Sequence, residues 1–221
     1  MWTLERDTQK VTIDQGELVS YTVNGHEFIH QKGSPGWGSA DTEMFPIIGP
    51  VNDANFRVQV PKGSAVQDQH GLLRQFPYQR ASVSTDSATY VKHYKAHTPI
   101  RNTKYPEKST EAWLVWPYSF AFEKQFQLLE TGLVISFHIS GEHNMPFMLG
   151  YHPAFKLHTK KPLIKTPEQT ISLEAVLAVG SRALQVPNCE RITLEDQHKI
   201  TITTSGFGHF MCWTEVPNMV C

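Results

Sequence analysis

Two histidines of this 221-residue sequence have neighbours that suit them to proton transfer. His152 lies in Gly150-Tyr151-His152-Pro153-Ala154-Phe155, where the following proline biases it toward an extended backbone and the glycine permits close approach of another segment. Imidazole gives and takes protons near neutral pH, and a preorganised donor needs a ring direction that is fixed in this way. From these residues alone, a strand-end histidine that bonds a backbone carbonyl is the alternative.

His70 lies in Gln69-His70-Gly71-Leu72-Leu73-Arg74, after a polar loop that contains glycine. We expect this segment at a sheet margin, with Arg74 on the same side as the imidazole. A guanidinium group donates two parallel hydrogen bonds to a polyol or to an anionic group. The alternative is a loop histidine beside a surface arginine.

Signatures of other chemistries are absent from the sequence. It has no G-x-G-x-x-G, no P-loop, no G-x-S-x-G and no H-E-x-x-H. His93 and His97 are four residues apart, but the sequence around them is typical of a strand, where this spacing separates two side chains by about 13 Å. The adjacent Glu195 and Asp196 indicate a solvated turn rather than an acid/base pair. We therefore expect neither a metal nor a cofactor.

Period-two alternation predicts the elements that must position these residues. It is clearest in residues 133–140 and 120–128, and it recurs in 56–60, 199–203 and 18–23, with Asn-Gly, Thr-Gly and Pro-Asn turn signals between the runs. Residues 173–179 are compatible with a short helix or a buried strand. Strands joined by turns predict antiparallel sheets in a sandwich or a barrel. The polar stretch 95–111 is typical of a long surface loop or an excursion near a site.

Composition limits the class of protein. Apolar residues make up 40% of the chain, enough for the core of one large domain, which we expect to span residues 1–221. Twenty basic and 21 acidic residues give a net charge of −1, which disfavours nucleic acid and anionic membranes as partners. The charged N-terminus and the short apolar runs indicate neither export nor a membrane span, and three cysteines without C-x-x-C spacing indicate reduced thiols in a cytoplasmic protein.

Four motifs, taken together, give the chain a family resemblance. Phe45-Pro46-Ile47-Ile48-Gly49, His70-Gly71-Leu72-Leu73-Arg74, Trp116-Pro117-Tyr118-Ser119-Phe120 and the His152 motif occur in the order and approximate spacing seen in aldose 1-epimerases. The sequence resembles the bacterial branch of these galactose mutarotase-like proteins over nearly its whole length. The resemblance implies a large antiparallel β-sandwich whose concave face holds a sugar, and an activity that interconverts α and β anomers without a cofactor.

The resemblance also implies roles for single residues. His152 matches the acid that protonates the ring oxygen, His70 the histidine that hydrogen-bonds the sugar, and Arg74 a polar substrate contact. Many relatives have an arginine where this chain has Pro50, and Asn52 is a candidate substitute. Trp116 and Tyr118 are candidates for a stacking floor under the sugar, with a place in the core as the alternative.

The catalytic base is the largest departure from the family pattern. Residues 211–221 resemble the segment that runs into an Ile-Glu-Pro sequence, whose glutamate is the base. We expect the 221 residues to lack a C-terminal part that carries this base and the closing strands; the alternative is a naturally short and impaired protein. We do not expect Glu215 to replace it. Glu174 and Asp196 are candidates for the acidic residue that grips sugar hydroxyls.

The expected partner is a small-molecule sugar, bound by a monomer or homodimer. A hexose is the leading substrate. The alternatives are a hexose 6-phosphate, a carbohydrate-binding protein that does not catalyse, and an all-β scaffold that recruits a protein partner.

Overall fold

The computed structural model describes residues 1–221 as a nearly all-β chain, with 47% of residues in strands and 6% in helices. The sheets are antiparallel, which confirms the predicted fold class. The chain divides into two compact units. Unit 1 comprises Met1–Gln9, Ile13–Glu17 and Thr42–His152, and unit 2 comprises Lys10–Thr12, Leu18–Asp41 and Pro153–Cys221.

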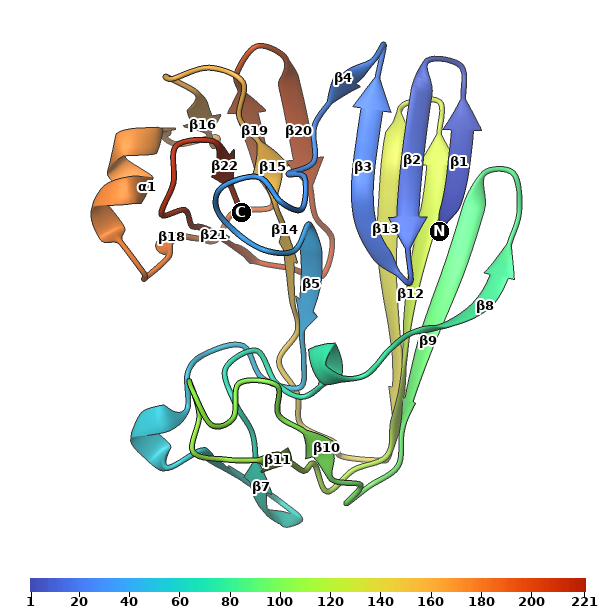
Figure 1. Ribbon diagram of the computed structural model, residues 1–221, viewed down its shortest axis with the longest axis vertical. Helices are drawn as coiled ribbons and strands as arrows, with labels where there is room; N and C mark the ends of the chain where they lie inside the picture. The colour runs from blue at the N-terminus through green and yellow to red at the C-terminus, as the bar shows by residue number, and fades with distance from the viewer. The chain divides into compact units, whose positions relative to one another are not determined.

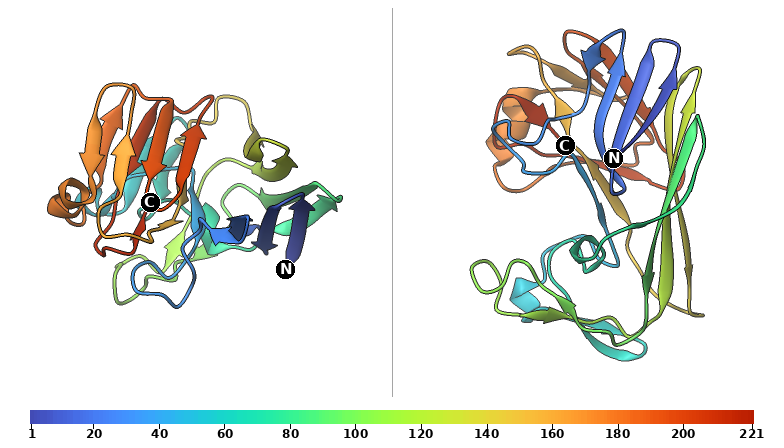
Figure 2. Two further views of the ribbon diagram at one scale, coloured as in Figure 1. Left: turned by 90° about the horizontal axis from the view of Figure 1, so that it is seen from above. Right: turned by 45° about the vertical axis from the view of Figure 1, so that its right-hand side comes forward.

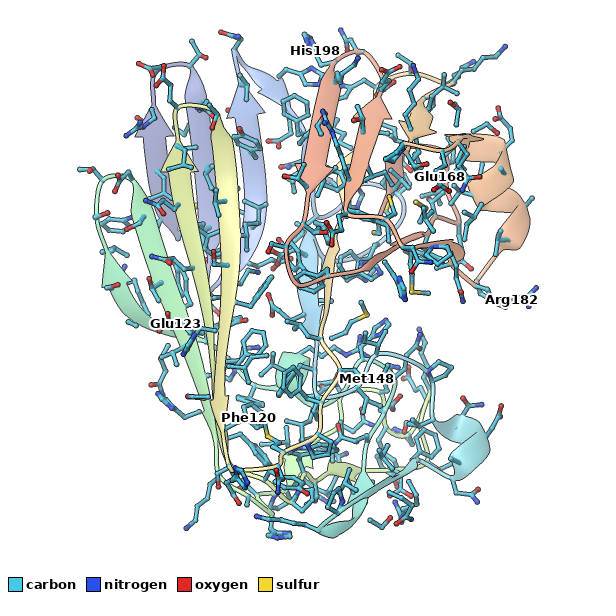
Figure 3. All side chains as sticks on the ribbon, turned by 180° about the vertical axis from the view of Figure 1, so that it is seen from behind. Phe120, Glu123, Met148, Glu168, Arg182 and His198 are labelled. Carbon is cyan, nitrogen blue, oxygen red and sulfur yellow. The ribbon has the colours of Figure 1, made fainter.

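Unit 1 is organised around a four-stranded sheet with the order β13-β12-β9-β8 (Figure 1). The ladder between β12 and β13 runs from the Phe120–Gly141 pair to the Leu129–Gly132 pair. Even-numbered residues of β12 are buried and odd-numbered ones are more exposed, so Phe120 and Glu123, both labelled in Figure 3, belong to opposite faces. The strands of this sheet are β8 (Gln79–Val83), β9 (Ser87–Tyr94), β12 (Phe120–Leu129) and β13 (Gly132–Gly141).

An aromatic core packs against this sheet within unit 1. Phe45, Trp116, Tyr118, Phe120 and Phe122 belong to it, and each is at most 4% exposed. Burial of such side chains supplies the main free energy of folding, about 25 cal/mol per Å² of apolar surface. The other elements with at least half of their residues in unit 1 are β1 (Trp2–Arg6), β2 (Gln9–Asp14), β5 (Asp41–Met44), η1 (Asn52–Ala54), β6 (Arg57–Val60), β7 (Gly63–Val66), η2 (Leu73–Gln75), β10 (Ile100–Arg101), β11 (Trp113–Leu114) and β14 (Gly150–Pro153).

One charged residue lies on the buried face of β12. Lys124 is fully buried, and its Nζ atom lies 2.6 Å from Oε1 of Glu43, itself 3% exposed. Burial alone would raise the pKa of Glu43, but the charges of Lys124 and Lys92 and the hydrogen bonds from Lys124 and Tyr78 outweigh burial and lower it. The buried carboxylate is therefore ionised and paired.

Unit 2 contains a four-stranded sheet of its own, with the order β17-β16-β19-β20. Its strands have the orange to red colours of the C-terminal part of the chain in Figure 2. The hydroxyl oxygen of Ser172 accepts a hydrogen bond from the backbone of Ala175 and caps α1, so residues 173–179 form a helix rather than a strand. All three cysteines are free thiols. The elements of unit 2 are β3 (Glu17–Val23), β4 (His26–Glu27), β15 (Phe155–Lys156), β16 (Leu163–Lys165), β17 (Thr170–Ser172), α1 (Leu173–Val179), β18 (Leu184–Pro187), β19 (Arg191–Glu195), β20 (Lys199–Thr203), β21 (His209–Cys212) and β22 (Met219–Val220).

The strands predicted for residues 133–140, 120–128, 56–60, 199–203 and 18–23 are confirmed to within a few residues.

No helix of the chain is long and apolar enough to cross a membrane.

The buried ion pair makes Glu43→Gln a costly substitution. Removing the carboxylate leaves buried ammonium groups without their counter-ion, so we expect the free energy of unfolding to fall by about 3–5 kcal/mol. Urea denaturation of the purified protein measures this loss. Glu123→Gln, on the opposite face of β12, is the matched control and should cost less than about 0.5 kcal/mol. Equal losses for the two variants would contradict the assignment of an ionised buried pair.

Candidate active site

Within unit 1, backbone hydrogen bonds join the Phe45 motif to the His70 motif. The Phe45 amide donates to the His70 carbonyl at 3.2 Å, the His70 amide donates to the Ile48 carbonyl at 3.1 Å, and the Leu73 amide donates to the Phe45 carbonyl at 3.1 Å. Two segments about 25 residues apart in sequence therefore run side by side. The His70 loop takes its shape from the Phe45-Pro46-Ile47-Ile48 segment.

The close approach of these segments explains Gly71. Its φ angle is +70°, and a Cβ atom at this position would lie 2.2 Å from the Phe45 carbonyl oxygen. No other residue type fits this position without moving backbone. His70 is itself held in the left-handed region, at φ 72°.

The ring of His70 is oriented by a hydrogen bond to the same segment. Its Nδ1 atom lies 2.8 Å from the Ile48 carbonyl oxygen. A carbonyl only accepts, so Nδ1 carries the proton and Nε2 of the neutral ring is an acceptor. His70 can therefore accept a hydrogen bond from a hydroxyl group of a ligand.

The His152 motif lies against the Phe45 motif. A Cβ atom on Gly150 would lie 2.4 Å from Cε of Met44 and 3.4 Å from Cδ1 of Ile48. Strand β14 thus packs tightly beside residues 44–48 and carries His152 to the loop that bears His70. The two imidazole centroids are 6.0 Å apart, with an interplanar angle of 58°. The structure brings together two rings that are 82 positions apart in sequence, a spacing that allows both to touch one small molecule.

Burial keeps both rings neutral. It lowers the pKa of His70 to about 4; the bond to the Ile48 carbonyl opposes this shift, and the charges of Arg74 and Lys104 add to it. Burial likewise lowers the pKa of His152 to about 4, with a further contribution from Arg74. At pH 7 the pair therefore carries almost no charge.

Arg74 lies in η2, directly after the His70 loop, and is half-buried. Burial lowers its pKa, and the Asp68 carboxylate opposes that shift. Asp68 is also bonded by Lys104 Nζ at 3.0 Å and by Asn102 Nδ2 at 2.9 Å. Burial would raise the pKa of Asp68, but the hydrogen bonds from Asn102 and Lys104 outweigh burial and lower it. One carboxylate thus stabilises the positive charges beside His70.

The sequence did not single out Lys104 or Asp68. Lys104 belongs to the polar stretch 95–111, and the pattern that marked this stretch as an excursion near a site was its only signal. Its partner Asp68 is 36 positions away, a distance across which charge patterning in sequence says nothing.

Three further residues predicted to contact the sugar lie in the core or on the surface. Trp116 and Tyr118 are each 1% exposed in the core of unit 1, so their rings offer no open face for stacking. The structure gives them the core role, because both are members of the buried aromatic cluster. Asn52 is exposed in η1, and its amide donates to Asp53 Oδ1 at 3.0 Å.

The acidic candidates in unit 2 are surface or turn residues. Asp196 accepts from the backbone of His158 at 2.5 Å and of Thr159 at 3.0 Å, which anchors a turn after β19. Glu174 is exposed in the first turn of α1, and Glu215 is exposed near the C-terminus.

Unit 2 also contains a histidine cluster that the sequence did not suggest. The ring of His26 lies 4.2 Å from that of His158 and 4.1 Å from that of His198, which Figure 3 labels between β19 and β20 (centroid distances). Burial, followed by the charges of both neighbours, lowers the pKa of His26. No group of three histidine, cysteine or acidic side chains in the chain is arranged to hold a metal ion.

Comparisons with known proteins agree with this architecture. Residues 16–214 match the family described as aldose 1-epimerase. A galactose mutarotase-like protein from Lactobacillus casei is 18% identical, with a TM-score of 0.78 over 100% of this chain and 86% of that one. A galactose mutarotase related enzyme from Lactobacillus acidophilus is also 18% identical, with a TM-score of 0.77 over 100% and 83%. A comparison with curated proteins finds no match. The predicted galactose mutarotase-like fold is confirmed.

Gly71→Ala tests the close approach of the two motif segments. We expect it to lower the free energy of unfolding by about 3 kcal/mol, because the methyl group must displace the Phe45 carbonyl as well as adopt a left-handed backbone. Gly25→Ala is the matched control: its φ is +79°, but nothing lies within 4 Å of the added atom, so only about 1 kcal/mol is expected. If urea denaturation shows that the two variants lose similar amounts of unfolding free energy, the proposed contact is contradicted.

The neutral rings predict a pH dependence of stability. A folded-state pKa near 4 against an unfolded value near 6.5 means that the unfolded chain binds more protons between these pH values, so stability falls as pH falls through this window. Each ring should contribute up to about 1.4 kcal/mol per pH unit. In the double variant His70→Gln, His152→Gln, the free energy of unfolding from urea denaturation should depend less steeply on pH between pH 7 and pH 5. Parallel slopes would show that the rings are not buried as neutral groups.

Proposed function

Because the chain belongs to the aldose 1-epimerase family, we propose that it interconverts the α and β anomers of a free hexose by acid/base ring opening and reclosure. The observation that carries this proposal is the convergence of His70 and His152, whose centroids are 6.0 Å apart, beside Arg74. Residue types that suit proton transfer to a polyol come together there from two distant motifs.

The reaction moves protons and leaves the oxidation state unchanged. A base removes the proton of the anomeric hydroxyl, a carbonyl forms at the anomeric carbon, and the bond from that carbon to the ring oxygen breaks as this oxygen takes up a proton. Rotation about the bond to the neighbouring carbon, followed by reclosure with the roles reversed, gives the other anomer. Each positioned acid or base typically contributes about 10²–10⁴-fold in rate.

We assign the acid role to His152 and the hydroxyl-binding roles to His70 and Arg74. With a pKa near 4 the His152 ring is neutral in the free protein and meets the ring oxygen as a hydrogen-bond donor. A carboxylate base brought to the same sugar raises that pKa, because an opposite charge favours the protonated ring. His70 accepts from a hydroxyl through Nε2, and Arg74 donates two bonds to further hydroxyls.

The base is not among the carboxylates that surround these residues. Glu43 is ion-paired with Lys124, and Asp68 accepts from Lys104 and Asn102. The family resemblance gives the role to a glutamate of an Ile-Glu-Pro segment, which the 221 residues do not contain. The engagement of Glu43 and Asp68 by other side chains favours a second candidate function, a protein that binds the sugar without catalysing anomer exchange.

The distribution of cations supports an unphosphorylated hexose over a hexose 6-phosphate. Lys92 donates to a backbone carbonyl in the core, Arg101 lies over the rings of Tyr105 and Trp113, and Lys104 is paired with Asp68. Arg74 is the remaining cation beside His70. A phosphate ester would need more positive charge than one arginine provides.

Polarimetry on freshly dissolved α-glucose and α-galactose tests the proposal. We expect the full-length gene product to accelerate relaxation to the equilibrium mixture, and His152→Gln to lower its kcat/KM by about 10²–10⁴-fold through loss of the acid. His93→Gln, an exposed histidine on β9, is the matched control and should retain the wild-type rate.

Three outcomes separate the alternatives. A relaxation rate that the protein leaves unchanged, together with hexose binding in calorimetry, would reject the epimerase and support the sugar-binding protein. Faster relaxation of a hexose 6-phosphate than of a hexose would reject the unphosphorylated substrate. Acceleration that His152→Gln does not affect would reject the assigned acid.

A further inference from the structure

Unit 1 contains a buried cluster of two lysines and one glutamate that the proposed reaction does not use. Lys92 is 5% exposed, Glu43 3% and Lys124 0%. Lys124 bonds Glu43 directly, and the positive charge of Lys92 also acts on that carboxylate. One carboxylate thus serves two ammonium groups, and Lys92 must find further compensation elsewhere.

Lys92 finds that compensation in the segment that carries Arg74. Its Nζ atom donates to the Leu73 carbonyl at 2.8 Å and lies 4.2 Å from the ring centroid of Tyr78 and 5.4 Å from that of Phe76. A methionine would fill the same space without the desolvation cost of a buried ammonium. Besides its interaction with Glu43, the Lys92 ammonium therefore holds the backbone and rings of residues 73–78.

The contact with Leu73 constrains the residue that follows. The Leu73 carbonyl, the Arg74 amide and the Arg74 Cα belong to one planar peptide group, so holding the oxygen also restricts where the Arg74 Cα lies. The other peptide group of Leu73 is fixed as well, because its amide donates to the Phe45 carbonyl at 3.1 Å. The turn η2 is held from β9 on one side and from the Phe45 segment on the other.

We propose that Lys92 is a positioning residue for Arg74: by holding the Leu73 carbonyl, it fixes the turn from which the guanidinium reaches the sugar. The inference rests on the proposed function for the role of Arg74. Lys92 itself touches no substrate, and its effect on sugar binding passes through η2.

Substitution of Lys92, alone and together with Arg74, tests this role. We expect Lys92→Met to raise KM by roughly 5–10-fold with kcat within about twofold of wild type, which is the pattern for loss of uniform binding. Arg74→Gln should raise KM at least as much. The double variant should match Arg74→Gln alone, because Lys92 has nothing left to position. A rise of KM in the double variant equal to the product of the two single-variant rises would overturn the proposal.

A stability control separates positioning from general destabilisation. Leu128→Ala removes a fully buried side chain of β12 and should lower the melting temperature while leaving KM unchanged. An equal rise of KM in Leu128→Ala would show that loss of stability alone explains the Lys92 effect. If Lys92→Met does not fold, Lys92→Gln, which keeps a neutral donor, enters the same double-variant test.

Amide hydrogen exchange gives a readout that does not depend on activity. In Lys92→Met the amides of Leu73 and Gln75, both hydrogen-bonded in wild type, should exchange at least about tenfold faster, while those in the middle of the β12–β13 ladder keep their protection. If the wild type fails to accelerate mutarotation but the exchange result holds, the proposed function fails and the anchoring of η2 stands. Unchanged exchange at residues 73 and 75 would overturn the inference even if the protein is an epimerase.

Discussion

The site depends on the hydrogen-bonded contact between the Phe45–Ile48 segment and the His70 loop. This contact keeps His70 in a left-handed backbone conformation, orients its imidazole through the Ile48 carbonyl, and places Leu73 and hence Arg74. The same segment packs against Gly150 and so brings His152 to the loop. Glycines occupy the two positions where a side chain would separate these backbones, and this is why the motifs contain them.

The electrostatics of unit 1 suit an uncharged ligand. Both imidazoles are neutral at pH 7, and the acidic side chains around them are engaged by lysines or amides. A polyol can bind to such a site by exchanging hydrogen bonds with water for hydrogen bonds with fixed groups, without moving a formal charge out of solvent. The guanidinium of Arg74 would then orient the polyol through its hydrogen bonds as well as attract its hydroxyl oxygens.

Sequence reasoning predicted the strands, and it named the two histidines whose rings the structure brings together; its failures have physical reasons. Alternation identified β12 and β13 because each strand buries one face, and motif context identified His70, Arg74 and His152. Alternation could not place Trp116 and Tyr118 in the core, since a large aromatic residue suits a core and a sugar platform equally. No pattern in the sequence indicated a buried role for Lys92, because its partners, the Leu73 carbonyl and Glu43, are set by tertiary packing over 19 and 49 positions.

The buried lysine of β12 has a consequence for how that strand finds its partners. A shift of one residue would turn every phenylalanine of the strand outward, so the apolar pattern already opposes it. A shift of two residues keeps the same faces and satisfies that pattern equally well. Such a slipped arrangement, however, would carry the Lys124 ammonium about 7 Å away from Glu43 and leave it in hydrocarbon without a counter-ion. The apolar pattern of β12 does not distinguish these two registers, but the buried charge of Lys124 does. A polar residue in the interior thus specifies the register of this strand.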